Sequence, residues 1–312
     1  MKDKKKNKFP MILLCTPTTV EDIEYYYNYF QTYISPSRII VIGNGKVKQI
    51  IENEQLPVEY MDEDNLYPGL SFQSVKKAIY ARTKEENALK RTGWYFQQFL
   101  KMAYSYSIAS DEQEYLIWDS DTVPTHVVTM YAENGKRYFD VKTEYHEPYF
   151  KTLSQLFPEL RKNNDYSFIS EHMLVDKNVM CNLIQNIERN VNIDGNYFWE
   201  KIINAVDVNT LSESGFSEFE TYGTYCQFYY RDLYEIREWK SLREGAIFYG
   251  NKIKEENLKY LSKAYDAVSF ESHESHIKLQ KIFCHKFFQR LIWIKSFEAF
   301  KNLLKKIMGY YE

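Results

Sequence analysis

The chain has 312 residues, of which 44% are hydrophobic and 27% charged, with a formal net charge of −3. This length is ample for a buried core in one large domain or two modest ones. Glycine occurs only 11 times, whereas average usage of about 7% would give roughly 22. No G-x-x-x-x-G-K-[ST] loop occurs, and Gly43-Asn44-Gly45 lacks the third glycine of a dinucleotide fingerprint. The composition therefore argues against a P-loop NTPase and an ordinary NAD dehydrogenase.

The first third of the chain alternates between short apolar runs, typical of buried strands, and stretches with helical periodicity. The expected strands are 10–15, 38–42, 58–61 and 115–118, and the expected helices are 20–33, 46–54, 72–81 and 93–107. Strands separated by helices predict an α/β fold, in which a mostly parallel central sheet binds ligands beyond the carboxyl ends of its strands. The later pattern is less regular, with a strand-like stretch at 168–175, a helix at 178–189 and an aromatic helix or strand at 219–230.

The N-terminal segment and the cysteines bear on the cellular setting. Residues 1–9 form a basic lead, and the apolar run 9–15 is too short to span a membrane and has no small-residue cleavage site. The four cysteines are scattered without a C-x-x-C pair, which argues against a zinc ribbon and a disulfide framework. We therefore expect a protein of the reducing cytoplasm that is not secreted.

The C-terminal tail, residues 276–312, is basic and rich in aromatic residues. Between residues 278 and 312 there are eight Lys or Arg and two acids, whereas the rest of the chain is acidic. Apolar residues recur at helical spacing, as at 283, 287, 291 and 294. Such a basic amphipathic helix is typical of an interfacial membrane anchor. The alternative is a helix packed on its own domain with a solvated basic face. Because the body is acidic, no nucleic-acid partner is expected.

Two aspartates, Asp119 and Asp121, follow the apolar strand 115–118 with Ser120 between them. Carboxylates at i and i+2 can hold one hard divalent cation, Mn²⁺ or Mg²⁺, whose other positions take water and a diphosphate. Another D-x-D lies at 62–64, so the spacing alone is common, and the preceding strand distinguishes the first. The alternative is a turn in which the aspartates make Asx-type bonds. With no glycine-rich cradle, a nucleotide diphosphate would have to be held through a metal here.

The expected helix 93–107 carries an apolar face and a second face formed by Trp94, Gln97, Gln98 and Lys101. Because this helix precedes the strand that leads to the D-x-D, we expect the four side chains to line a donor pocket, where Lys101 would neutralise diphosphate. A solvated face is the alternative, although a tryptophan beside two amides is unusual there.

Two further pairs of residues are candidates for the reaction itself. Glu171 and His172 end a strand-like stretch and are candidates for acceptor binding, with a purely structural histidine as the alternative. Glu218 is the first candidate for a general base that takes a proton from an acceptor hydroxyl in an inverting transferase. Glu220 is the second, because the S-x-x-E pattern from Ser217 gives it a capping-box alternative.

Several of these segments resemble bacterial GT-A-fold glycosyltransferases of surface-polysaccharide synthesis, of the capsule or O-antigen type. They are residues 10–16, 93–101, 116–124, 168–174 and 216–223. The resemblance implies a Rossmann-like GT-A domain at 10–275, with a donor half at about 10–125 and an acceptor half at about 126–275.

The resemblance also implies a reaction and its participants. A hexosyltransferase would move a sugar from a nucleotide-diphosphate sugar, most simply a UDP-sugar, to a glycan or lipid-linked acceptor. The donor would contact Thr16 and Ser120 beside the D-x-D, and His273 would complete the metal site unless it lies in a surface loop. With the tail as an anchor, the expected location is the inner face of the cell membrane, with peripheral attachment.

Two other functions remain open from the sequence. A nucleotidyltransferase or phosphosugar transferase would also use paired carboxylates and a metal. A non-catalytic carbohydrate-binding or membrane-scaffold protein would use the many tyrosines and tryptophans for sugar stacking, and would need no metal.

Overall fold

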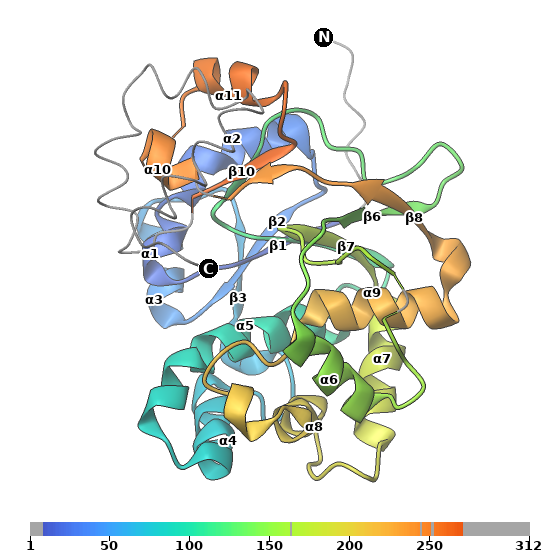
Figure 1. Ribbon diagram of the computed structural model, residues 1–312. Helices are drawn as coiled ribbons and strands as arrows, with labels where there is room; N and C mark the ends of the chain where they lie inside the picture. Colours follow the sequence, from blue (N-terminus) through green and yellow to red (C-terminus); the bar gives the residue numbers. More distant parts are fainter. Residues whose placement is uncertain (1–8, 163, 244, 251–252, 271–312) are drawn as a thin grey trace, which may run out of the picture. The chain divides into compact units, whose positions relative to one another are not determined.

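The computed structural model describes residues 9–270, apart from 163, 244, 251 and 252 (Figure 1). The expected C-terminal tail and His273 lie outside the described residues. Within the described part, the chain forms two compact units. The first comprises 9–21, 36–120 and 130–238, and the second 22–35, 121–129 and 239–270. Each unit is thus assembled from separate stretches of chain, and the expected donor and acceptor halves stay a prediction.

The first unit contains a five-stranded sheet in the order β3-β2-β1-β4-β7. Its strands are β1 (Met11–Leu14), β2 (Ile39–Gly43), β3 (Glu59–Asp62), β4 (Glu114–Trp118) and β7 (His172–Asp176). The first four run parallel, and β7 is antiparallel to β4. This confirms the α/β fold with a mostly parallel central sheet and the four strands expected in the first third.

The central strands are apolar runs because helices cover both faces of a parallel sheet. Every residue of β2 is buried, as are all residues of β4 except Glu114. In the sheet, β2 and β3 lie on one side of β1, and β4 lies on the other side. Successive strands are thus added in one direction as far as β3 and in the opposite direction from β4 on. The position between β1 and β4 is therefore the topological switch point of the sheet.

Helices of the first unit match most of the expected periodicity. They are α1 (Pro17–Val20), α3 (Gly45–Asn53), α4 (Phe72–Thr83), α5 (Thr92–Ala103), α6 (Glu147–Leu156), α7 (Lys177–Arg189), α8 (Phe198–Ala205) and α9 (Glu218–Tyr229). Short 3₁₀ segments occupy Glu63–Asn65, Glu86–Arg91, Tyr104–Tyr106, Val208–Thr210 and Arg231–Leu233. The aromatic segment that the sequence left open is the helix α9. A separate parallel pair, β6 (Arg137–Val141) and β8 (Tyr234–Glu238), belongs to the same unit.

The second unit is built around a small mixed sheet in the order β5-β10-β9. Its elements are α2 (Ile23–Tyr33), β5 (Thr122–Pro124), β9 (Ser241–Leu242), α10 (Gly245–Tyr249), α11 (Glu255–Leu261) and β10 (Ala267–Ser269). Strand β10 runs antiparallel to β5 and parallel to β9. The ring of Tyr26 in α2 stacks on that of Phe270, with 5.9 Å between the ring centroids.

The helix expected at 20–33 is divided between α1 and α2. Among the described residues, none of the helices has the length and apolar character needed to cross a membrane.

Candidate active site

The switch point brings together the ends of β1 and β4. Thr16 follows β1, and its exposed side chain caps α1 by accepting a hydrogen bond from Thr19 N at 3.3 Å. Ser120 Oγ donates to the carbonyl of Leu14 at 3.1 Å, which ties the end of β4 to that of β1. Open α/β sheets bind their ligands beyond the carboxyl ends of the strands at such a point. Asp119, the first residue after β4, lies at this edge.

A buried lysine joins two of the predicted site residues. Lys101 in α5 places its Nζ 3.1 Å from Asp119 Oδ1 and 3.0 Å from Glu218 Oε1. Glu218 is the first residue of α9, so the three side chains come from three separate elements. The sequence predicted each of them as a site residue on separate grounds, and the fold brings all three into one cluster.

This Asp119–Lys101–Glu218 cluster carries one excess negative charge. Burial by itself would lower the pKa of Lys101, but the attraction of Asp119 and then of Glu218 outweighs burial and raises that pKa. The ammonium therefore stays charged between its two carboxylates. The side chains of Lys101 and Glu218 are 7% and 5% exposed, whereas that of Asp119 is 38% exposed. The excess negative charge thus reaches solvent through Asp119.

Neighbouring groups hold the cluster in place. Gln98 is buried, and its Oε1 accepts a hydrogen bond from Glu218 N at 3.1 Å while its Nε2 donates to Trp94 O at 3.3 Å. The ammonium of Lys101 also lies 4.8 Å from the ring centroid of Phe219, close enough for a cation–π contact. Gln98 thus fixes the first turn of α9 by protein contacts, and its predicted donor contact stays a prediction.

The remaining residues of the expected donor face differ in exposure. Trp94 is only partly exposed, and its ring stacks on Tyr149 with 6.4 Å between centroids. Gln97 is partly exposed as well. The helix α5 is therefore buried on most of its surface, and the predicted donor contacts of Trp94 and Gln97 stay predictions.

The two glutamates of α9 have different environments. Ser217 caps the helix by accepting from Glu220 N at 3.2 Å. The carboxylate of Glu220, however, accepts from Phe168 N at 3.0 Å and from the hydroxyl of Ser167, so only half of the expected capping box forms. Burial raises the pKa of Glu220. Glu220 thus anchors α9 to the chain before β7, while Glu218 faces the lysine.

A glycine allows this close approach of α9. A Cβ atom added to Gly223 would lie 2.3 Å from the ring of Phe168. No side chain fits at that distance, so the helix can pack on Phe168 only with glycine at this position.

Glu171 and His172 lie at the same sheet edge as Asp119. His172 begins β7 and pairs with Trp118 in the antiparallel register, so these residues start a strand instead of ending one, as the sequence suggested. The backbone N–H of Asp119 donates to the carbonyl of Glu171 at 2.8 Å. The carboxylate of Glu171 forms an ion pair with Lys142.

A second buried cluster supports His172. Its Nε2 lies 2.7 Å from Asp140 Oδ2, and Arg237 donates from Nε to Asp140 Oδ1 at 2.5 Å. Burial would raise the pKa of Asp140, but hydrogen bonds from His172 and Arg237 outweigh burial and lower it. Sequence reasoning missed Asp140, Arg237 and Lys142. The only available signal was an acid between apolar residues in Tyr-Phe-Asp-Val, residues 138–141.

The two D-x-D sequences behave differently. Asp62 ends β3, and its carboxylate accepts from Asp64 N at 3.1 Å and from Asn65 Nδ2 at 3.0 Å, which is an Asx turn. Asp119 instead pairs with Lys101. Asp121 belongs to the second unit, where its carbonyl accepts from Phe270 N at 2.9 Å. The Asx turn, which was the alternative considered for Asp119 and Asp121, is therefore found at residues 62–64.

Among the His, Cys, Asp and Glu side chains that the structure describes, no group of three or more is arranged to hold an ion. A carboxylate such as that of Asp119 is a ligand type that a hard divalent cation prefers, and Mg²⁺ is commonly bound by one or two carboxylates together with water and substrate phosphates. The metal site at Asp119 and Asp121 stays a prediction.

Comparisons with known proteins give similarity of fold only. No protein-family model and no curated protein matches the chain. The structure is similar to that of mouse xyloside xylosyltransferase 1, with a TM-score of 0.39, 7% identity and coverage of 85% of this chain and 97% of that one. It is also similar to the bifunctional glycosyltransferase WbbM, with a TM-score of 0.33, 10% identity and coverage of 93% of this chain and 53% of that one.

Proposed function

We propose that this protein is a metal-dependent glycosyltransferase of the GT-A type, which moves a sugar from a nucleotide-diphosphate sugar to a glycan or lipid-linked acceptor. The observation that carries the proposal is the contact of one buried lysine with both Asp119 and Glu218. These two carboxylates were predicted independently as the metal-binding and the proton-accepting groups of such an enzyme. Their joining at the switch point of a mostly parallel sheet supports a single active site.

Asp119 and Asp121 would hold Mn²⁺ or Mg²⁺ together with the diphosphate of the donor. When bound, the ion supplies electrostatic stabilisation for the departing nucleoside diphosphate. Asp119 suits this function because its carboxylate is partly exposed and the cluster keeps one excess negative charge. Lys101 in turn holds Asp119 in one orientation.

Glu218 would act as the general base. Its carboxylate accepts the proton of the acceptor hydroxyl as the hydroxyl oxygen forms a bond to the anomeric carbon and the bond from that carbon to the diphosphate breaks. Attack from the side opposite the leaving group inverts the configuration. The ammonium of Lys101 forms an ion pair with the carboxylate of Glu218, and the amide of Gln98 fixes the helix turn that carries it.

Other parts of the proposal rest on the sequence. Thr16, Trp94, Gln97 and Ser120 would contact the donor, with a UDP-sugar as the first choice. Glu171 and His172 would contact the acceptor, and His273 would be a further metal ligand. The tail at 276–312 would attach the enzyme to the inner face of the cell membrane, where capsule or O-antigen synthesis takes place.

The test is turnover of nucleotide sugars by the full-length chain. We would incubate it with Mn²⁺ and a panel of UDP-, GDP- and dTDP-sugars and measure release of nucleoside diphosphate, with EDTA as the metal-free arm. Asp119→Asn should remove metal-dependent turnover and binding. The matched control is Asp64→Asn, which changes an exposed aspartate of the other D-x-D and should retain both.

Three outcomes would overturn the proposal. No nucleotide sugar binds, or Asp119→Asn leaves metal-dependent binding unchanged, or the released nucleotide is a nucleoside monophosphate or, when pyrophosphate is added, a nucleoside triphosphate. The third outcome identifies a nucleotidyltransferase or phosphosugar transferase. Sugar binding without any metal requirement would instead identify a carbohydrate-binding protein.

A further inference from the structure

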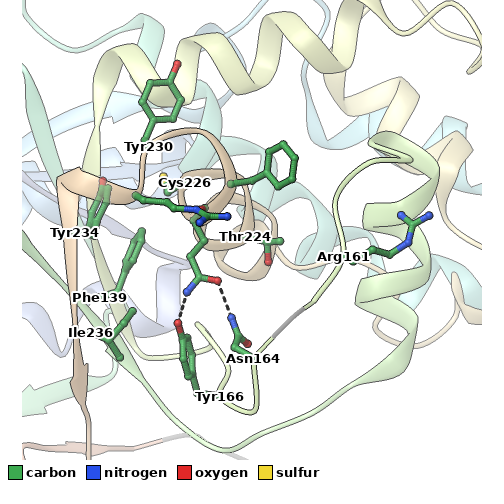
Figure 2. A pocket seen from close by; sticks show the side chains of 12 residues that line it. Phe139, Arg161, Asn164, Tyr166, Thr224, Cys226, Tyr230, Tyr234 and Ile236 are labelled. Atoms are coloured by element: carbon green, nitrogen blue, oxygen red, sulfur yellow. Dashed lines mark hydrogen bonds between the residues drawn. The ribbon is translucent and has the colours of Figure 1, made fainter.

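The first unit contains a cavity of about 320 Å³ that none of the predicted site residues lines. Its walls come from the C-terminal half of α9, from β6 and β8, and from the chain around residues 161–166. Figure 2 shows Phe139, Tyr234 and Ile236 on one side of the cavity and Arg161 on the other. Ligand pockets span roughly 300–1,000 Å³, so this one suits a ligand near the small end of that range.

This cavity is distinct from the Asp119–Lys101–Glu218 cluster. Glu218 and the lining residue Gln227 are nine positions apart on α9. At 1.5 Å and 100° per residue, that separation is roughly 14 Å along the axis and half a turn around it. This end of the cavity is therefore about two and a half helical turns away from the candidate base, so a ligand there is not the reacting sugar.

The cavity presents an ordered set of polar groups beside an aromatic wall. Asn164 Nδ2 donates to Gln227 Oε1 at 2.6 Å, and Gln227 Nε2 donates to the hydroxyl of Tyr166 (Figure 2). The rings of Phe139 and Tyr234 stack with 3.7 Å between centroids. Amides and phenols bond hydroxyl groups, and aromatic faces pack against the C–H face of a sugar ring. The lining thus has the amphipathic character that a carbohydrate requires.

Two arginines add positive charge. Arg161 donates to the carbonyl of Leu160 at 2.7 Å and Arg231 to that of Gln227 at 2.9 Å. Within the described part of the chain, neither guanidinium is within ion-pair distance of a carboxylate, and none of the described lining residues is acidic. Arginine binds carboxylate and phosphate through paired N–H groups. The lining therefore favours a ligand that carries one of these anions.

We propose that this cavity is a second carbohydrate site, which binds an acidic sugar with its carboxylate or phosphate at Arg161 or Arg231. The anionic part of the inference follows from the lining. The choice of a sugar over another small anion rests on the proposed function. The site would hold a part of the glycan that is remote from the reacting end.

The test is direct binding, measured by calorimetry or saturation-transfer NMR on the full-length chain without donor. The probes are glucose, glucuronate and glucose 6-phosphate, which share one ring and differ in charge, with inorganic phosphate as a ring-free anion. We expect glucuronate or glucose 6-phosphate to bind at least about tenfold more tightly than glucose and inorganic phosphate, because a charge-assisted hydrogen bond contributes about 1.5–3 kcal/mol. The two acidic probes separate carboxylate from phosphate as the preferred anion.

Variants locate the binding. One of Arg161→Gln and Arg231→Gln, at the arginine that holds the anion, should weaken the acidic probe about tenfold or more and leave glucose unchanged. The matched control is Arg189→Gln, since Arg189 is exposed at the end of α7 and does not line the cavity. Equal binding of glucose and the acidic probes, binding by inorganic phosphate as tight as by the sugars, or full binding by both arginine variants would each overturn the proposal.

The outcome is independent of the test of the enzyme. Release of nucleoside diphosphate with no acidic-sugar binding removes the second site and leaves the glycosyltransferase. Acidic-sugar binding that depends on Arg161 or Arg231, with no turnover of any nucleotide sugar, leaves the site and removes the glycosyltransferase.

Discussion

Two clusters of charged side chains lie at or near the same edge of the central sheet. The arrangement of acidic and basic groups in one cluster is the reverse of that in the other. In the first, one base, Lys101, lies between two acids, Asp119 and Glu218. In the second, one acid, Asp140, lies between two basic partners, His172 and Arg237. The first keeps an excess negative charge, and the second keeps none.

Exposure separates the clusters further. The side chains of Asp140 and His172 are each 2% exposed, so both are nearly closed to solvent, and the cluster links β6, β7 and β8. Asp119 in the first cluster is 38% exposed. A closed cluster without excess negative charge holds strands together, whereas an open one with excess negative charge can bind a cation. The comparison therefore supports the proposed chemistry at Asp119 and indicates a structural function for Asp140.

The largest expected effect is on turnover, at Glu218. Glu218→Gln removes the proposed base while its amide oxygen can still accept from Lys101, so the fold should be retained. We expect donor turnover to fall by about 10²–10⁴-fold, the usual contribution of a positioned general base. Steady-state release of nucleoside diphosphate measures the effect, and the thermal unfolding midpoint checks the fold.

The competing candidate sharpens this test. Glu220→Gln should change turnover little, because its carboxylate is engaged by Phe168 N and Ser167. Glu54→Gln, in an exposed position after α3, is the matched control. If the loss of turnover follows Glu220→Gln and not Glu218→Gln, the assignment of the base is wrong.

The next effect is on stability, at Lys101. Lys101→Met leaves the nearly buried Glu218 without its cation, and breaking a buried ion pair by removing one partner costs about 3–5 kcal/mol of unfolding free energy. Urea denaturation measures this loss. Adding Glu218→Gln to Lys101→Met should restore part of the stability, because the unpaired charge is then gone. A double variant no more stable than Lys101→Met would show that the lysine acts by packing and not by pairing.

Sequence reasoning found the sheet and one of these clusters but not the other. Continuous apolar runs predicted β1 to β4 because both faces of a parallel strand are buried. Asp119, Lys101 and Glu218 could each be selected from local context, since a strand end, a helix face and a helix N-terminus are local features. That Lys101 would join the other two could not be predicted, because the contacts span residues 101 to 218.

The second cluster was missed for a related reason. Asp140 and Arg237 meet because β6 and β8 pair in parallel, with these two residues opposite each other in register. Nothing in either local sequence specifies that pairing. The turn at 62–64 and the proposed site at Asp119 also share one spacing. The apolar strand before Asp119 separated them in the sequence, and their different tertiary partners separate them in the structure.

The smallest expected effect is at Asp140 and depends on pH. Asp140→Asn removes the charge between His172 and Arg237. We expect a loss of about 1–3 kcal/mol of unfolding free energy at pH 6, since Arg237 is 27% exposed and keeps part of its hydration. The pKa of Asp140 is lowered in the folded state. Its stabilisation is therefore complete above the unfolded pKa of about 3.9 and is lost as the pH falls through the lower folded value.

The measurement is urea denaturation of the wild type and Asp140→Asn from pH 6 to pH 3. The difference in unfolding free energy between them should shrink below about pH 4, because the wild type loses the stabilisation that the variant never had. Donor turnover at pH 7, corrected for the folded fraction, should stay within about threefold of the wild type, since Asp140 is nearly closed to solvent. Parallel pH profiles would mean that Asp140 is not stabilised as an anion in the folded state. A loss of turnover as large as that of Glu218→Gln would mean that both clusters, and not only the one at Asp119, belong to the active site.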